Sequence, residues 1–113
     1  MDPVTVVRGQ VEAFNARDVD RFVSYYSVDA VLEDGNGQVM AQGRDALRAL
    51  YGQLFAQSHA LHADIPQRIH VGCYVIDEEE VSGFIFEGFP SEMHIAVIYR
   101  VEGDTIAHAR TLF

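Results

Sequence analysis

The spacing of apolar residues changes near residue 62, and this change constrains the fold more than any other feature of the sequence. Before it, apolar side chains recur every three or four residues, as on one face of a helix; Val4, Val7, Val11 and Phe14 are an example. After it, apolar and polar residues alternate, as in a half-buried strand, for instance over Met93–Val101. Because helices and strands are segregated along the chain, we predict an α+β fold with helices on one face of a curved antiparallel sheet.

Three helices are predicted in the front half of the chain. Asp2 can cap a helix that starts at Pro3, where the missing N–H group is not needed. Asp18 can cap a second, short helix, and Gly43 can cap a third. The expected apolar faces of the second and third helices are Val19, Phe22, Val23 and Tyr26, and Leu47, Leu50, Tyr51, Leu54 and Phe55.

A hairpin before the third helix and a run of strands after it are also predicted. Gly35, Asn36 and Gly37 form a turn signal between two short apolar segments. The acidic segment Asp77–Glu80 is interpreted as another turn, exposed to solvent. The expected strands are Ala30–Asp34, Val39–Ala41, a long strand through Ile65–Ile76 that is bent or bulged near Pro66 and Gly72, Val81–Phe89, Met93–Val101 and Thr105–Phe113.

Length and charge narrow the classes of function. The chain has 113 residues, which fits a single domain over residues 1–113. Its formal net charge of −9 argues against nucleic acid and against an anionic membrane surface as partners. The single cysteine, Cys73, forms no internal disulfide and is expected to be a buried, inert thiol. With no evident signal peptide and no membrane-spanning run, we expect a soluble cytoplasmic protein.

Three short helices cannot close a curved sheet completely, so a hollow is expected between the two layers. Hollows lined by apolar groups are where small ligands bind. We therefore expect an apolar small molecule as the partner. The residues expected to bind it are Gln10, Phe22, Tyr26, Tyr51, Phe55, Ile95, Val97, Tyr99, Thr111 and Phe113.

Four segments of the sequence resemble ketosteroid isomerases and SnoaL-type polyketide cyclases. They are Val11–Asp20, Asp29–Asp34, Gly43–Tyr51 and Arg100–Ile106, in the same order as in those families. The resemblance covers nearly the whole chain and implies a cystatin-like cone of the nuclear-transport-factor-2-like type. That superfamily contains enzymes, binding modules and assembly domains, so the resemblance alone does not define an activity.

The resemblance to ketosteroid isomerase implies a role for Asp34, which matches the general base of those enzymes. It would take a proton from a carbon next to a carbonyl group and return it elsewhere. The sequence departs from the family at the two oxyanion donors, because the tyrosine of the first helix is replaced by Gln10 and the aspartic acid of the penultimate strand by Val97. Asp34 can also be a turn-forming residue, since it precedes Gly35–Gly37.

Two functional hypotheses therefore remain open. The first is a small-molecule-binding domain that acts as an isomerase-type enzyme through Asp34 on an apolar carbonyl compound. The second is a non-catalytic ligand-binding or dimerisation module of the same fold. The acids of cyclases lie on later strands, and the final strand offers Ala107, Ala109, Thr111 and Phe113 in their place, which disfavours cyclase chemistry.

The outer sheet face and the histidines carry two further hypotheses. His94, Arg100, His108 and Arg110 are expected to point away from the hollow, where they form either a second polar site or, as we favour, part of a homodimer interface. The pair His59 and His62 lacks a third ligand, so no metal and no cofactor is expected.

Overall fold

The computed structural model describes residues 1–113 and begins with the helices that the sequence predicts. They are α1 (Pro3–Asn15), α2 (Val19–Ser24) and α3 (Arg44–Gln57). The predicted caps of α1 and α2 are confirmed, because a carboxylate oxygen of Asp2 accepts a hydrogen bond from the Thr5 amide at 2.9 Å and Asp18 accepts one from the Arg21 amide at 3.1 Å. None of these helices is long and apolar enough to cross a membrane.

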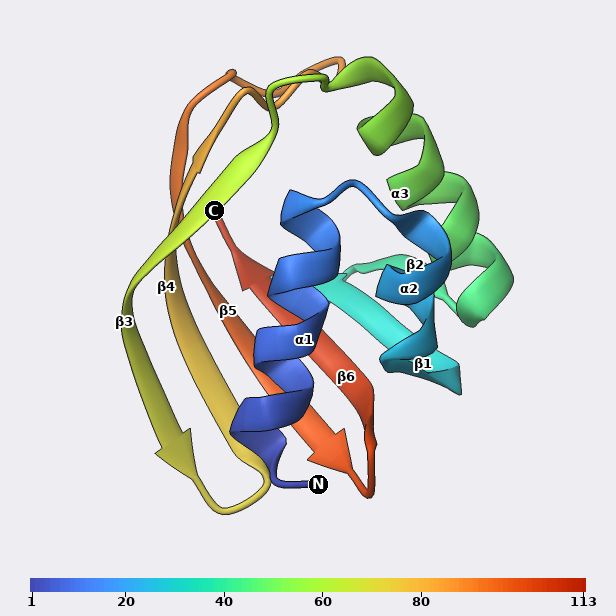
Figure 1. Ribbon diagram of the computed structural model, residues 1–113, viewed down its shortest axis with the longest axis vertical. Helices are drawn as coiled ribbons and strands as arrows, with labels where there is room; N and C mark the ends of the chain where they lie inside the picture. Colours follow the sequence, from blue (N-terminus) through green and yellow to red (C-terminus); the bar gives the residue numbers. More distant parts are fainter.

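Six strands form one sheet in the order β2-β1-β6-β5-β4-β3 (Figure 1). All neighbouring pairs are antiparallel except β1 and β6, which run parallel. Parallel neighbours need a long crossover connection, and here the chain between β1 and β6, with α3 and the other strands, supplies it. The strands are β1 (Tyr26–Asp34), β2 (Val39–Gln42), β3 (His62–Val71), β4 (Tyr74–Ser82), β5 (Met93–Glu102) and β6 (Thr105–Leu112).

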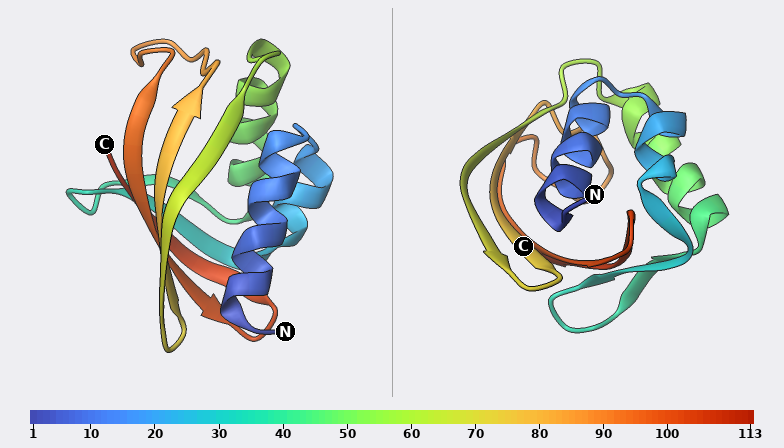
Figure 2. Two further views of the ribbon diagram at one scale, coloured as in Figure 1. Left: turned by 60° about the vertical axis from the view of Figure 1, so that its left-hand side comes forward. Right: turned by 60° about the horizontal axis from the view of Figure 1, so that its bottom comes forward.

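The sheet curves around the helices, with α1 lying inside its concave face and α3 against β1 and β2 (Figure 2). Register shifts lie between β1 and β6, between Asp64 and Gln67 of β3, and between β5 and β6. Such bulges bend a strand and increase its twist. They therefore give the sheet the curvature that the cone requires, and the predicted α+β cone is confirmed.

The predicted strands between residues 65 and 89 are wrong in their boundaries. The expected long strand is a hairpin, β3 and β4, which turns at Gly72 with a φ of 60°. The segment Asp77–Glu80, expected as an exposed turn, lies in the middle of β4, and the expected strand Val81–Phe89 is mostly a loop over residues 83–92. The error arose because four consecutive acids were taken as solvated, whereas two of them face the interior.

Smaller corrections concern Cys73 and Tyr26. Cys73 lies in the β3–β4 turn and is exposed to solvent. In the expected long strand it would have been buried, but no part of the chain packs over this turn. Tyr26 is the first residue of β1 and not part of α2, since the helix ends at Ser24. Its side chain is nevertheless buried, as the sequence predicts.

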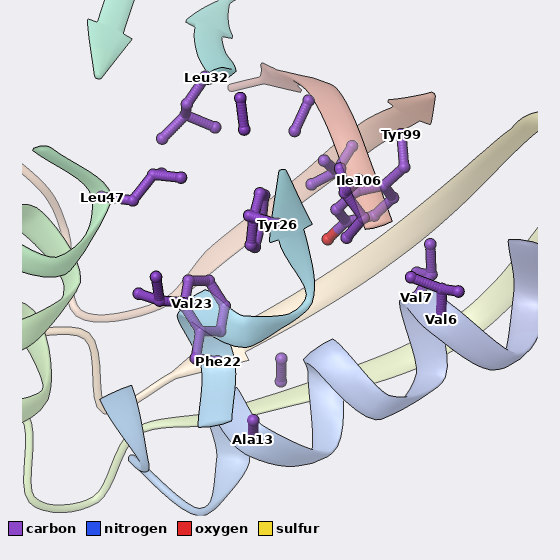
Figure 3. Close-up of a cluster of buried hydrophobic side chains, with 14 of the residues drawn as sticks. Val6, Val7, Ala13, Phe22, Val23, Tyr26, Leu32, Leu47, Tyr99 and Ile106 are labelled. Atoms are coloured by element: carbon purple, nitrogen blue, oxygen red, sulfur yellow. The ribbon is translucent and has the colours of Figure 1, made fainter. Parts of the chain in front are cut away.

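The core lies between α1, α2, α3 and the concave face of the sheet (Figure 3). Aromatic rings hold α2 and α3 together, with the Phe22 and Tyr51 centroids 4.4 Å apart and Phe22 and Tyr26 5.2 Å apart. Offset and tilted ring pairs of this kind add stability beyond the area they bury. The side chains that are buried completely, with no exposed surface, include Val6, Val7, Phe22, Leu47 and Ile106.

Gly83 provides a test of the loop that follows β4. It has a φ of 69°, and a Cβ atom there would lie 2.2 Å from the carbonyl oxygen of Ala60. We expect Gly83→Ala to lower the free energy of unfolding by roughly 3 kcal/mol, because left-handed strain and a backbone clash combine. Gly72→Ala is the control, since its φ is 60° with no atom within 4 Å of the added Cβ; it should cost only about 1 kcal/mol. If urea denaturation gave the same loss of unfolding free energy for Gly83→Ala and Gly72→Ala, the Ala60 backbone would have to move away from the added Cβ atom at no cost.

Candidate functional site

A cavity of about 280 Å³ opens between the helices and the concave face of the sheet. It has 22 lining residues, of which 19 are hydrophobic. The three others are Gln10 on α1, Glu79 on β4 and Thr111 on β6. A cavity of about 150 Å³ already holds a benzene molecule, so this one has room for a ligand of one or two rings.

Phenylalanine rings border the exposed side of the cavity. Phe84, Phe86 and Phe89 come from the 83–92 loop, and Phe113 comes from the C-terminus, with the Phe89 and Phe113 centroids 5.4 Å apart. Phe113 is 62% exposed and Phe89 is 37% exposed, which places them at the opening. The loop is fixed to the end of α3, because the Ser58 hydroxyl accepts a hydrogen bond from the Ile85 amide at 2.9 Å.

Glu79 is the acidic group of this cavity, and its side chain is only 7% exposed. Burial raises its pKa to about 7, and the negative charge of Asp77 acts in the same direction. A hydrogen bond from the Tyr99 hydroxyl to Oε2, at 3.2 Å, and the positive charge of Arg68 lower the pKa and offset part of this effect. Oε1 accepts no hydrogen bond from the protein and is not enclosed by it, so it is open to the cavity.

A chain of hydrogen bonds continues from Glu79 to α1 and β1. Gln10 donates to the Tyr99 hydroxyl at 3.4 Å and to the carbonyl of Val7 at 3.4 Å, and its own Oε1 accepts from the Tyr26 hydroxyl at 2.8 Å. Burial raises the pKa of both tyrosines, so they remain neutral donors. Because both amide hydrogens of Gln10 are engaged, Gln10 orients the two tyrosines and has no free donor for a ligand.

Asp77 lies two residues before Glu79, on the same face of β4, and is completely buried. Its two carboxylate oxygens accept hydrogen bonds from Nε and Nη2 of Arg68 at 2.6 and 2.8 Å. This bidentate pair satisfies both partners. Arg68 is therefore committed to Asp77, and Glu79 has no basic side chain of its own.

Eight of the ten residues predicted to bind a ligand line the cavity. Phe22 and Phe55 do not; they pack behind Tyr51, with ring centroids 4.4 and 6.0 Å from it. Those that line it are Gln10, Tyr26, Tyr51, Ile95, Val97, Tyr99, Thr111 and Phe113.

Asp34 is not in the cavity lining, although it pairs with the lining residue Thr111 across β1 and β6. Its Oδ1 atom accepts hydrogen bonds from the amides of Asn36 and Gln38, both at 2.9 Å. The carboxylate thus closes the β1–β2 turn, which is the turn-forming alternative that the sequence left open. Of the two histidines considered as a metal pair, His62 contacts Asp64 at 3.0 Å, and no group of three potential ligands is arranged to hold a metal ion.

Sequence reasoning missed Glu79 and the phenylalanines of the 83–92 loop. A signal for Glu79 was available, because Val75, Asp77, Glu79 and Val81 alternate on one face and both ends of that series are apolar. Acids between two buried valines at a period of two belong to the inner face of a strand. The loop has no comparable signal, since Phe84 and Phe86 alternate as they would in a strand.

The sequence matches the SnoaL-like domain family over residues 7–109, and the chain therefore belongs to that family. A search of curated proteins finds no significant match.

Solved structures with the same fold include several bacterial proteins. An uncharacterized cystatin-fold protein from Novosphingobium aromaticivorans has a TM-score of 0.90 and 29% identity, covering 100% of this chain and 99% of its own. A putative polyketide cyclase from Sinorhizobium meliloti has a TM-score of 0.76 and 22% identity, covering 95% and 93%. A protein with a ketosteroid isomerase-like fold from Catenulispora acidiphila, in complex with trimethylamine, has a TM-score of 0.77 and 17% identity, covering 96% and 84%.

The raised pKa of Glu79 makes the stability of the protein depend on pH. Because the folded pKa of about 7 lies above the usual glutamate value of 4.5, the contribution of Glu79 to stability is fully present below pH 4.5 and is lost as the pH rises through 7. Glu79→Gln does not ionise. We therefore expect the free energy of unfolding of the variant, relative to that of wild type, to be about 2 to 3 kcal/mol higher at pH 8 than at pH 5, which means a relatively more stable variant at pH 8.

Urea denaturation at both pH values measures this difference, and Glu80→Gln is the matched control because Glu80 is exposed on the same strand. A constant difference between Glu79→Gln and wild type from pH 5 to pH 8 would contradict the raised pKa.

Proposed function

We propose that this SnoaL-like domain binds a small, mainly apolar molecule in the cavity and that Glu79 exchanges a proton with it. The observation that carries this proposal is a buried carboxyl group with a pKa of about 7 and one free oxygen in an otherwise apolar cavity. A group whose pKa lies near the working pH can both accept and donate a proton. The apolar lining supplies the binding energy, and Glu79 supplies the chemistry.

The catalytic form of this proposal is an isomerase-type reaction on an apolar carbonyl compound. Glu79, and not Asp34, would take a proton from the carbon next to the carbonyl group and return it to another carbon. The charge that develops on the carbonyl oxygen requires a donor. Tyr51 suits this role, because it lines the cavity, its hydroxyl makes no hydrogen bond within the protein, and burial raises its pKa so that it stays protonated.

Structural relatives support a small-molecule function for this fold. One relative is described as a putative polyketide cyclase and another was solved with trimethylamine. Both are similar to this chain at identities that establish the shared fold. They do not define the ligand of this chain.

A non-catalytic binding module is the second candidate function. It is favoured by Gln10, which stands where the resemblance expects a tyrosine donor and whose amide hydrogens are both engaged, and by the apolar Val97. In this alternative the cavity holds its ligand without turning it over, and Glu79 only orients it.

Exchange of carbon-bound protons separates the two candidates. Cyclohexanone in D₂O, followed by NMR, reports whether protons next to the carbonyl group are exchanged. We expect wild-type protein to accelerate this exchange and Glu79→Gln to slow it by at least about 100-fold, the lower range for loss of a general base.

Asp34→Asn should keep the wild-type exchange rate, because asparagine can retain the turn of Asp34. Loss of exchange in Asp34→Asn but not in Glu79→Gln would return the role of base to Asp34. No acceleration by the wild type, together with cyclohexanone binding, would favour the non-catalytic module.

We also propose a homodimer through the outer sheet face. Charges on this face are partly paired within the chain, since Glu33 contacts both Arg110 at 2.5 Å and His108 at 3.0 Å. Apolar side chains nearby remain exposed, including Leu112 and Val39. A face of this kind is suited to burial against a second copy.

Sedimentation velocity tests the dimer. Ile98 pairs with Arg110 across β5 and β6, on the side of the sheet opposite Val97 and Tyr99. We expect a wild-type dimer and a monomeric Ile98→Glu variant, because an unpaired charge would be buried in the interface. Ala56→Glu on the exposed side of α3 is the control and should remain dimeric. A wild-type monomer at micromolar concentration would overturn the proposal.

A further inference from the structure

The cavity lining contains a single ionisable carboxylate and no basic side chain. Glu79 is its one acidic residue, and no Arg, Lys or His is among the lining residues. The basic side chain that acts on Glu79 is Arg68, and its Nε and Nη2 atoms are engaged by Asp77. An ionised Glu79 therefore lies in an apolar surrounding without a countercharge, which is a costly arrangement unless something else supplies one.

Oε1 of Glu79 is the atom at which a countercharge can enter. Oε2 is held by the Tyr99 hydroxyl at 3.2 Å, whereas Oε1 has no partner in the protein and is open to the cavity. A carboxylate oxygen without a donor accepts most strongly from a charged N–H group. A neutral hydroxyl donor would satisfy the hydrogen bond but would leave the negative charge uncompensated.

Aromatic rings make up a large part of the cavity wall. Tyr26, Tyr51, Tyr99 and Phe14 all line the cavity, and burial keeps the three tyrosines neutral by raising their pKa. The faces of such rings attract ammonium groups and are indifferent or unfavourable to anions. The cavity thus combines a carboxylate with aromatic rings, which suits a cation that carries an apolar substituent.

The opening of the cavity also favours a positively charged ligand. The 83–92 loop contains Glu87 and Glu92 and no basic residue, and its phenylalanines border the cavity. The formal net charge of the whole chain is −9. A potential of this sign raises the local concentration of cations and lowers that of anions near the opening.

From these observations we infer that the cavity selects a small apolar amine in its ammonium form, whose N–H group binds Oε1 of Glu79 while its hydrocarbon part fills the aromatic lining. The inference rests on the proposed function because it uses the same cavity and the same carboxylate. It adds the charge of the ligand: a cation is preferred over a neutral molecule of the same shape, and an anion is rejected.

Three probes of one shape and different charge test this inference. Benzylamine is protonated at pH 8, benzyl alcohol is neutral and benzoate is an anion. Titration calorimetry at low ionic strength should give an affinity for benzylamine at least tenfold above that for benzyl alcohol, and an affinity for benzoate at least tenfold below it. An affinity for benzyl alcohol equal to or above that for benzylamine would overturn the inference.

Two variants separate the cavity from the general negative charge of the protein. Glu79→Gln keeps the shape of the side chain, so it should retain benzyl alcohol binding and lose the tenfold preference for benzylamine. Glu80→Gln removes the same charge from an exposed position and should retain the preference. A preference that survives in Glu79→Gln would mean that the amine binds elsewhere on the acidic surface, and would overturn the inference.

The pH dependence gives a second measurement on unaltered protein. The groups that set the pKa of Glu79 at about 7 are Asp77, Arg68 and Tyr99, and the two other titratable groups that interact with it, Tyr26 and Tyr51, stay neutral because their own pKa values are raised. Because the protonated carboxyl group cannot pair with an ammonium group, benzylamine affinity should fall at least tenfold from pH 8 to pH 5.5, while benzyl alcohol affinity should change little. An equal response of both probes to pH would overturn the inference.

The outcomes also distinguish this inference from the proposed function. If benzyl alcohol binds and the amine has no advantage, the cavity remains a binding site and only the charge preference is wrong. If none of the probes binds, both the inference and the proposed ligand-binding function fail. If the amine preference follows Glu79 and cyclohexanone exchange is absent, the protein is an amine-binding module without isomerase-type activity.

Discussion

The ion pair between Arg68 and Asp77 allows an acidic strand to form the inner wall of the sheet. β4 lies between β3 and β5 and contributes Glu79 and Val81 to the cavity. Without Arg68, the buried carboxylate of Asp77 would have no countercharge, and the face of β4 that carries Glu79 would be expensive to bury. The side chain of Arg68 reaches this position from the neighbouring strand and remains 21% exposed, so water still reaches part of the guanidinium group. The cavity thus depends on a charge pair that does not itself line it.

The same wall shows how polar groups can be placed in an apolar interior. Gln10 is 4% exposed, and both of its polar atoms are engaged, with Tyr26 on one side and Tyr99 on the other. A buried amide with all its partners present adds rigidity, whereas a partly satisfied one would weaken the core. The hydroxyls of Tyr26 and Tyr99 are therefore fixed in direction, and Oε1 of Glu79 and the hydroxyls of Tyr51 and Thr111 are left to meet a ligand.

The sequence predicted the helices and the cone well, because caps and apolar periodicity are local signals. Asp2 and Asp18 cap their helices through hydrogen bonds to amides three residues on. Of the five residues in the predicted α3 stripe, Leu47, Leu54 and Phe55 are buried, and Leu50 and Tyr51 line the cavity. The site was predicted only in part. The lining on β5 and β6 followed from alternation and Gln10 on α1 from the resemblance, but Glu79 was assigned to a turn because it lies within four consecutive acids. The pair that allows this acidic face to be buried joins Asp77 to Arg68, which lies nine residues earlier and is brought beside it by sheet register. Asp34 was assigned from a resemblance of position, and its local turn geometry takes precedence over that resemblance.

The polar groups of the cavity lie on a helix and strands, whereas most of the residues that border its opening lie on a loop. Glu79, Tyr99 and Gln10 sit on strands and a helix whose backbone is fixed by the sheet and the core, whereas Phe84, Phe86 and Phe89 sit on one loop held by Ser58. Changes in the loop can therefore alter the size and shape of the molecules admitted without disturbing the proton-exchanging group. In evolutionary terms the two properties can vary separately, which lets one scaffold acquire new ligands while retaining the same interior acid.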